Sequence, residues 1–258
     1  MSDGEVRLVR EGPVAYVTFD RPQARNAMTW KMYNEFAAIC ADLARDGSVR
    51  TAVLRGAGGK AFIAGTDIAQ FLEFRTPEDG LAYEKKIESF LSGLERLPIP
   101  TVAIVEGFAV GGGMAIASVC DFRVATPGSK FGVPIARTLG NCMSTGNVAR
   151  LVANVGPVIA KRMLLLGELL TAEMAQQVGF VHDIVAPEAI EARVKEMTDR
   201  FVKNAPITMR VSKEAVRRAT EAFVLDGEDL VRETYGSNDF REGVKAFTEK
   251  REPQWTGT

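Results

Sequence analysis

Two glycine-rich segments carry the residue types and spacing in this sequence that suggest chemistry. The first reads Gly-Ala-Gly-Gly-Lys-Ala over residues 56–61 and follows a β-prone run, as in the G-x-G-x-x-A pattern of dinucleotide-binding turns. That pattern needs a helix that begins inside it, whereas residues 62–65 form an apolar run with another glycine and have a low helix propensity. We therefore interpret residues 56–61 as a turn. A dinucleotide-dependent oxidoreductase is the alternative, and NAD(P)H titration would test it.

The second segment, Gly-Phe-Ala-Val-Gly-Gly-Gly over residues 107–113, offers a different chemistry. A buried-strand candidate at 101–105 leads into it, and an apolar helix candidate at 114–119 follows. Glycines at a strand-to-helix passage leave backbone N–H groups exposed at a helix N-terminus, where the helix dipole favours negative charge. This is how an oxyanion hole is built. The alternative is close helix-on-strand packing that leaves no room for a Cβ.

The composition excludes several classes of site. The 258 residues include 32 Lys+Arg and 33 Asp+Glu, which gives a net charge of -1. The chain therefore lacks the excess of basic residues expected of a protein that binds nucleic acid. A single histidine, His182, and three scattered cysteines cannot build a zinc site, and we predict no metal. A Ser-His-Asp arrangement would have only His182 as its base. We expect a structural or surface role for this histidine.

Neither a membrane segment nor a signal peptide is expected. The longest uncharged apolar stretch, residues 107–120, is too short to span a bilayer, and acids stand where a signal peptide needs basic residues. An odd number of scattered cysteines suits a reducing compartment better than a disulfide framework. We predict a cytoplasmic protein without a membrane or nucleic-acid partner.

The elements that must position these glycines alternate between strand and helix signals in the first half of the chain. Helix signals dominate after residue 144. We predict an α/β protein with an α/β core over residues 1–190 and a helical C-terminal region over 191–258. The expected strands are residues 6–9, 14–19, 51–54, 101–105, 122–125 and 181–185. The expected helices begin after Thr29, Thr76 and Ser144 and cover residues 114–119, 157–166, 171–179, 188–203, 207–220 and 239–250.

Seven segments, in order along nearly the whole chain, resemble the enoyl-CoA hydratase/isomerase (crotonase) superfamily. The segment at 61–68 is similar to the family's F-x-A-G-A-D-I, and that at 100–113 to its P-V-I-A-A-V-x-G-x-A-x-G-G-G. The other five are residues 21–28, 120–123, 130–134, 170–181 and 241–251.

This resemblance implies a ββα superhelix that trimerises through its C-terminal helices, as a trimer or a dimer of trimers. It implies an acyl-CoA thioester substrate, with coenzyme A as part of the substrate and no other cofactor. It implies an oxyanion hole made by the backbone N–H groups of Thr66 and Gly112. The implied CoA contacts are Arg25, Ala64, Asp67, Ile68, Phe247 and Lys250, the last two approaching the CoA of a neighbouring subunit.

The sequence departs from the family where water would be activated. The family's two catalytic glutamates correspond to Ala115 and Ile135, and neither side chain can act as an acid or base. The loop that follows is polar, and Arg137 and Asn141 are predicted to bind substrate. Cys142 and Ser144 are further candidates, although Ser144 also suits a helix cap and Cys142 needs a lowered pKa to act as a nucleophile.

Three functions remain open from the sequence. The first is an acyl-CoA enzyme of the hydratase/isomerase type that uses another proton-transfer group or a water. The second is a non-catalytic acyl-CoA-binding homologue. The third is an acyl-CoA decarboxylase or hydrolase, in which an oxyanion hole does most of the work.

Overall fold

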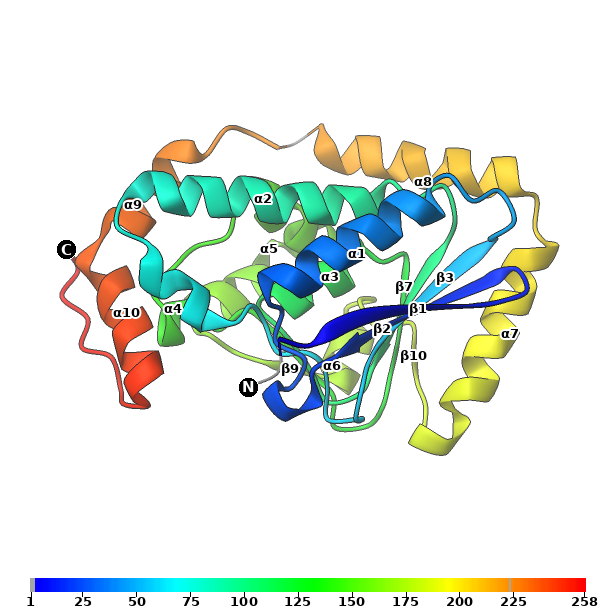
Figure 1. The fold of residues 1–258 in the computed structure, drawn as a ribbon, viewed down its shortest axis with the longest axis horizontal. Coiled ribbons are helices and arrows are strands. Elements are labelled where there is room, and N and C mark those ends of the chain that lie inside the picture. The colour runs from blue at the N-terminus through cyan, green and yellow to red at the C-terminus, as the bar shows by residue number, and fades with distance from the viewer. Residues whose placement is uncertain (1–2, 223) are drawn as a thin grey trace.

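The computed structural model describes residues 3–222 and 224–258 and contains two β-sheets surrounded by helices (Figure 1). The larger sheet has the strand order β1-β2-β3-β5-β7-β10. Strands β1 and β2 form an antiparallel hairpin, and every later neighbour in this sheet is parallel. Its strands are β1 (Glu5–Glu11), β2 (Val14–Asp20), β3 (Thr51–Gly56), β5 (Thr101–Val105), β7 (Phe122–Ala125) and β10 (Asp183–Ile184).

A smaller sheet of order β4-β6-β8-β9 supports the predicted site. Strands β4, β6 and β8 run parallel, and β9 is antiparallel to β8. Because β4 and β6 are neighbours, the chain segments that leave them emerge side by side. The strands are β4 (Ala61–Ile63), β6 (Phe108–Val110), β8 (Lys130–Gly132) and β9 (Leu170–Thr171).

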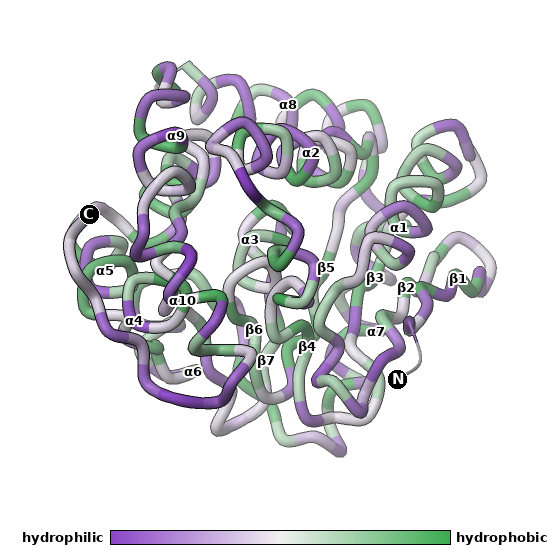
Figure 2. Tube along the Cα trace, turned by 60° about the vertical axis from the view of Figure 1, so that its left-hand side comes forward, coloured by the Kyte–Doolittle hydropathy of each residue, from purple (hydrophilic) through white to green (hydrophobic). Residues whose placement is uncertain are grey.

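Helices cover both faces of the larger sheet, as the alternation of side chains along a strand requires. On β3, Leu54 faces the main hydrophobic core together with α1, α2 and α3, whereas Val53 faces α7. Figure 2 shows α3 and the strands next to it as the more hydrophobic part of the chain. The helices up to α5 are α1 (Trp30–Leu43), α2 (Pro77–Glu95), α3 (Gly112–Val119), α4 (Ile135–Thr138) and α5 (Thr145–Leu165).

The later helices lie around this core. Helix α9 packs on α2, and α10 packs on η2 (Ile68–Glu73) and α9, next to the C-terminus (Figure 1). They are α6 (Ala172–Gln177), α7 (Ile190–Lys203), α8 (Pro206–Glu221), α9 (Glu228–Gly236) and α10 (Asn238–Glu249), with short turns η1 (Pro22–Ala24) and η3 (Pro187–Ala189). None of the described helices is long and apolar enough to cross a membrane.

The α/β class and the capped helices are confirmed. Thr29, Ser144 and Thr171 each accept a hydrogen bond from the backbone N–H three residues later, as N-caps do. The turn at residues 56–61 leads into strand β4 and not into a helix, so the dinucleotide pattern lacks its structural context.

Short elements escaped prediction. Strands β4, β6, β8 and β9 have two or three residues each and show no readable periodicity. The expected strand over 181–185 is shorter, because only residues 183–184 pair with β7. Helix α9 and the single turn of α4 were not expected. Gly156, at φ 77°, breaks α5 immediately before Pro157, where the sequence predicted a new helix.

Two glycines with positive φ, Gly107 after β5 and Gly128 after β7, provide a stability test. Gly107 has φ +73°, and a Cβ there would lie 2.0 Å from the carbonyl oxygen of Lys60. Gly128 has φ +83°, with nothing within 4 Å of such a Cβ. Both alanine variants strain the backbone, but only Gly107→Ala adds a clash. We expect Gly107→Ala to lower the free energy of unfolding by about 2 kcal/mol more than Gly128→Ala, measured by urea denaturation. Equal losses would contradict the close approach of these segments.

Candidate active site

The N-terminus of α3 forms one side of the candidate site. Strand β6 ends at Val110, and Gly111 (φ 56°) turns the chain so that α3 begins at Gly112. The N–H of Gly111 donates to the carbonyl of Gly132 in the neighbouring strand at 3.0 Å, which fixes the turn against the sheet. As the first residue of the helix, Gly112 has an N–H with no acceptor inside α3.

The segment after β4 forms the other side. The N–H of Met28 donates to Gly65, and the carbonyl of Met28 accepts from Asp67, each at 2.9 Å. Met28 therefore bridges the residues on either side of Thr66, as in a parallel ladder. The N–H of Thr66 consequently points away from Met28.

These two segments approach each other closely. The carbonyl carbon of Gly65, which is bonded to the Thr66 nitrogen, lies 3.7 Å from the position of a Cβ on Gly112. A Cβ on Gly113 would lie 2.0 Å from the carbonyl oxygen of Ile63, so glycine is required there. Within residues 3–222 and 224–258, no acceptor is found for the N–H of Thr66 or of Gly112. Two adjacent N–H donors, one at a helix N-terminus, can stabilise an oxyanion.

A buried hydroxyl cluster fixes the side chain of Thr66. Its Oγ1 lies 2.9 Å from the hydroxyl of Tyr33 and 3.0 Å from that of Tyr83. Burial raises the pKa of Tyr33 to about 12 and raises that of Tyr83 well above its usual value, so both phenols stay neutral. The cluster thus holds Thr66 through uncharged hydrogen bonds.

Ala115 and Ile135 are the residues that the sequence analysis predicts in place of the family's two glutamates. Ala115 is buried in the main core on α3, and Ile135 packs against that core at the start of α4. Both are aliphatic and neither can exchange a proton.

A different carboxylate is buried nearby, on α2. Glu84 Oε1 accepts from the hydroxyl of Tyr235 and Oε2 accepts from the N–H of Ser144, both at 2.9 Å. Burial raises the pKa of Glu84 to about 7. The hydrogen bonds from Tyr235 and Ser144 lower this pKa by less, and the nearby charge of Glu88 raises it further. Glu84 also borders a cavity of about 330 Å³ with Ser144 and Val231.

Four predicted CoA contacts lie on or beside the Thr66 segment. Ala64 donates to the carbonyl of Arg25 at 3.0 Å, so these two residues are held together. Arg25 is exposed, with its guanidinium over the ring of Phe108. Asp67 caps η2 and pairs with Arg21 at 2.8 Å, and Ile68 begins η2.

The remaining predicted substrate contacts are more dispersed. Arg137 is exposed on α4, whereas Asn141 lies in the loop before α5, with its Nδ2 3.4 Å from the Tyr235 hydroxyl. Phe247 and Lys250 are exposed at the end of α10, whose body packs on η2.

The other sequence candidates have structural explanations. Burial raises the pKa of Cys142 to about 11, so its thiol stays protonated and is no nucleophile. Ser144 caps α5, as the alternative interpretation predicted. His182 is half-exposed beside Phe122, at the edge of the larger sheet, which agrees with a surface role.

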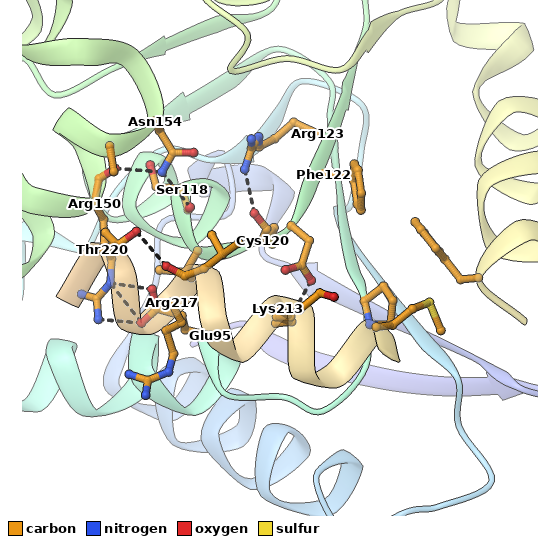
Figure 3. Close-up of a pocket in the computed structure, with 18 of the residues that line it drawn as sticks. Glu95, Ser118, Cys120, Phe122, Arg123, Arg150, Asn154, Lys213, Arg217 and Thr220 are labelled. Atoms are coloured by element: carbon orange, nitrogen blue, oxygen red, sulfur yellow. Dashed lines mark hydrogen bonds and ion pairs between the residues drawn. The ribbon is translucent and has the colours of Figure 1, made fainter. Parts of the chain in front are cut away.

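A cavity of about 500 Å³ lies elsewhere, between α8 and the core (Figure 3). Two of its lining cations form ion pairs, since Lys213 pairs with Asp121 at 2.7 Å and Arg150 pairs with Glu95 at 2.8 Å. Arg123 also lines it and donates to backbone carbonyls. No predicted site residue lines it. Because these side chains are already engaged in ion pairs or hydrogen bonds, this cavity offers a ligand less directed chemistry than the two N–H groups.

Tyr33, Tyr83, Glu84 and Tyr235 were not predicted as site residues. The sequence places Tyr83 on the apolar stripe of α2, where a packing role is expected. The position of Glu84 could have indicated a buried acid, because Glu84 stands at helical spacing between the buried Leu81 and Leu91. An acid at such a position needs partners when buried.

Known proteins resemble the chain over its whole length. The family profile described as enoyl-CoA hydratase/isomerase matches residues 10–258. A short-chain-enoyl-CoA hydratase of Clostridium acetobutylicum is 33% identical over 255 residues, covering 97% of each chain. The structure of a methylmalonyl-CoA decarboxylase with 2-nitronate-propionyl-CoA superposes with a TM-score of 0.89 at 27% identity, covering 98% of this chain and 99% of the other. That of an enoyl-CoA hydratase/carnithine racemase from Magnetospirillum magneticum gives 0.80 at 32% identity, covering 100% and 97%.

The raised pKa of Glu84 predicts a pH-dependent stability. A carboxyl whose pKa is raised by folding stabilises the fold at low pH and loses that contribution as the pH rises towards its folded value. Glu84→Gln does not titrate. The free energy of unfolding of the wild type minus that of Glu84→Gln should therefore fall between pH 4.5 and 8, by on the order of 3 kcal/mol.

Glu88→Gln is the matched control for this measurement. Burial opposes ionisation of Glu88, but hydrogen bonds from Arg150 and its charge lower the pKa overall. The corresponding difference for Glu88 should change with the opposite sign and in another range: it should rise with pH below about pH 5 and stay flat from there to pH 8. Denaturation curves at several pH values check both, and a flat or rising difference for Glu84 would be inconsistent with its buried setting.

Proposed function

The chain belongs to the enoyl-CoA hydratase/isomerase family, and from this premise we propose that it binds an acyl-CoA thioester and stabilises the enolate of that thioester with the N–H groups of Thr66 and Gly112. The observation that carries the proposal is the close approach of the Gly65–Thr66 peptide to the first residue of α3. An enolate places negative charge on the thioester oxygen. Two preorganised donors and a helix dipole stabilise that charge more than they stabilise the neutral carbonyl.

The coenzyme A part of the substrate would lie along the segment from Arg25 to Ile68. The exposed guanidinium of Arg25 suits a phosphate, and the backbone of Ala64 to Ile68 suits the adenine end. Phe247 and Lys250, on the helix that packs against η2, would complete this surface within a trimer or a dimer of trimers. No cofactor beyond the coenzyme A of the substrate is proposed.

Among reactions that pass through an enolate, decarboxylation of a 2-carboxyacyl-CoA suits these residues best. The bond between the α-carbon and the carboxylate breaks, CO₂ leaves, and the electron pair moves onto the thioester oxygen. The α-carbon then takes one proton from water. Hydration instead needs a base for water and an acid for the α-carbon, and Ala115 and Ile135 supply neither. The likeness in shape to methylmalonyl-CoA decarboxylase supports this choice.

A non-catalytic acyl-CoA-binding protein is the second candidate, and the aliphatic residues at 115 and 135 favour it. Turnover of a panel of enoyl-, 3-oxo- and malonyl-type CoA esters separates the two. The double variant Ala115→Glu/Ile135→Glu is the companion measurement. Hydration of crotonyl-CoA by the double variant but not by the wild type would show that the scaffold is competent for the family's water chemistry.

Removal of one oxyanion donor tests the proposed enolate stabilisation. Gly112→Pro deletes the N–H at the first helical position, where proline is tolerated. Gly112→Ala keeps the N–H but adds the same Cβ, which would lie 2.9 Å from the Tyr33 hydroxyl. On any ester that the wild type turns over, we expect kcat of Gly112→Pro to be about 100- to 1,000-fold below that of Gly112→Ala.

Equal kcat values for the two variants would place the charge stabilisation elsewhere. Absence of turnover of every ester, together with tight CoA-ester binding by the wild type, would favour the non-catalytic candidate.

A further inference from the structure

Two consecutive residues shortly before Met28 adopt a backbone conformation that side chains rarely accept. Arg25 has φ 51° and Asn26 has φ 58°, both in the left-handed region. Within the described part of the chain, Lys250 is the only other non-glycine residue with a positive φ. Asparagine tolerates this conformation because its short amide can bond the nearby backbone, whereas arginine gains no such compensation. A left-handed pair of this kind therefore needs surrounding contacts that hold it in place.

The side chain of Asn26 supplies these contacts. It is fully buried, and its amide bonds three separate backbone groups. Its Oδ1 accepts from the N–H of Arg21 at 2.9 Å, and its Nδ2 donates to the carbonyls of Ala57 at 3.0 Å and Ala61 at 2.8 Å. A Cβ on Gly56 would lie 2.6 Å from this Nδ2, so the first glycine of the turn before β4 makes room for the contact. One side chain thus ties its own segment to both ends of that glycine-rich turn.

The segment that Asn26 holds is the backbone neighbour of the oxyanion segment. The carbonyl of Arg25 accepts from the N–H of Ala64 at 3.0 Å. Two residues after Asn26, Met28 pairs with the residues on either side of Thr66. These backbone hydrogen bonds set the orientation of the Thr66 peptide. A shift of the left-handed pair would therefore be transmitted to the Thr66 N–H.

An ion pair closes the same unit. Arg21 Nη2 lies 2.8 Å from the carboxylate of Asp67, and Arg21 Nη1 donates to the carbonyl of Ala27 at 3.1 Å. The Arg21 side chain is buried, so this pair is largely shielded from water on the arginine side. Because Asn26 accepts from the backbone N–H of Arg21, it also helps to place this arginine. Contacts on both sides of Thr66 thus lead back to Asn26.

We propose that Asn26 is a positioning residue for the oxyanion donor of Thr66. Its amide holds residues 25 and 26 in the left-handed conformation, and this conformation aligns the backbone of Met28 with the chain after β4. That alignment sets the direction of the Thr66 N–H. The inference rests on the proposed function and specifies how one of its two donors is preorganised, on which the effectiveness of such donors depends.

The test reads the polarisation of a bound thioester directly. Butyryl-CoA, isotopically labelled at the thioester carbonyl, is bound to the wild type and to variants, and its carbonyl stretching band is followed by isotope-edited infrared spectroscopy. Donors of an oxyanion hole polarise the carbonyl and move this band below its frequency in water. Asn26→Gly keeps the left-handed backbone and removes the amide. We expect the band in Asn26→Gly to return most of the way to its position in water.

Asn154→Ala is the matched control. The Nδ2 of Asn154 also donates to two carbonyls, those of Ser118 at 3.2 Å and Arg150 at 2.8 Å, but this residue lies on α5 and lines the cavity beneath α8. Alanine suits its helical backbone, as glycine suits the left-handed backbone of Asn26. Asn154→Ala should lose stability in urea denaturation through the same kind of hydrogen bonds, yet keep the wild-type band.

Asn26→Asp is the second variant, in case Asn26→Gly does not fold. Aspartate also tolerates the left-handed conformation and keeps the acceptor for the Arg21 N–H. A protonated carboxyl group can donate to one of the two carbonyls, whereas an ionised group can donate to neither. Burial favours the protonated form, so the band should lie nearer to that of the wild type at about pH 5 than at about pH 8. The wild type is measured at both pH values as the reference.

The outcomes separate the inference from the proposed function. A band that moves back towards its position in water in Asn26→Gly, or at the higher pH in Asn26→Asp, and stays in place in Asn154→Ala supports the inference. Wild-type bands in both Asn26 variants, or an equal shift in Asn154→Ala, overturn it and leave the proposed function standing. A band of the wild type at the frequency of the free ester, or no binding of the ester by the wild type, overturns both.

Discussion

The close approach of the chain after β4 to the first turn of α3 is the constraint on which the rest of this structure depends. Gly113 permits it, because any side chain there would collide with the carbonyl of Ile63. The parallel pairing of β4 with β6 directs both segments to the same end of the small sheet. Met28 then pairs on either side of Thr66, so the N–H of Thr66 points away from Met28.

In the proposed function, chemistry at this site would fall on the backbone, because the side chains at the two predicted catalytic positions are aliphatic. Ala115 and Ile135 belong to the hydrophobic core or pack against it. The buried carboxylate of Glu84 accepts hydrogen bonds from Tyr235 and Ser144, so it helps to order the loop before α5. We therefore propose that electrostatic stabilisation by fixed backbone dipoles takes the place of paired acids.

The sequence was sufficient to predict the α/β class, the capped helices and the two segments that meet at the site. Capping residues such as Thr29 and the glycines at 111–113 have local physical causes, and these can be read without a structure. The resemblance assigned roles to Thr66 and Gly112, and the structure places them side by side. The strands of two or three residues were not predictable. They are stabilised by pairing with segments distant in sequence, and they are too short to show a hydrophobic periodicity.

The tyrosine–glutamate chain also escaped prediction, for a related reason. Tyr83, Glu84 and Tyr235 come from helices that are far apart in sequence, and only tertiary packing brings their polar atoms together. A buried acid at apolar spacing is a signal in the sequence, but it does not name its partners.

The most direct test of the central claim is a crystal structure of the protein with a non-hydrolysable acyl-CoA analogue. The account predicts that the oxygen replacing the thioester carbonyl lies about 2.7–3.1 Å from the backbone nitrogens of both Thr66 and Gly112. An analogue bound with that oxygen away from these two nitrogens, for example in the cavity beneath α8, would contradict it.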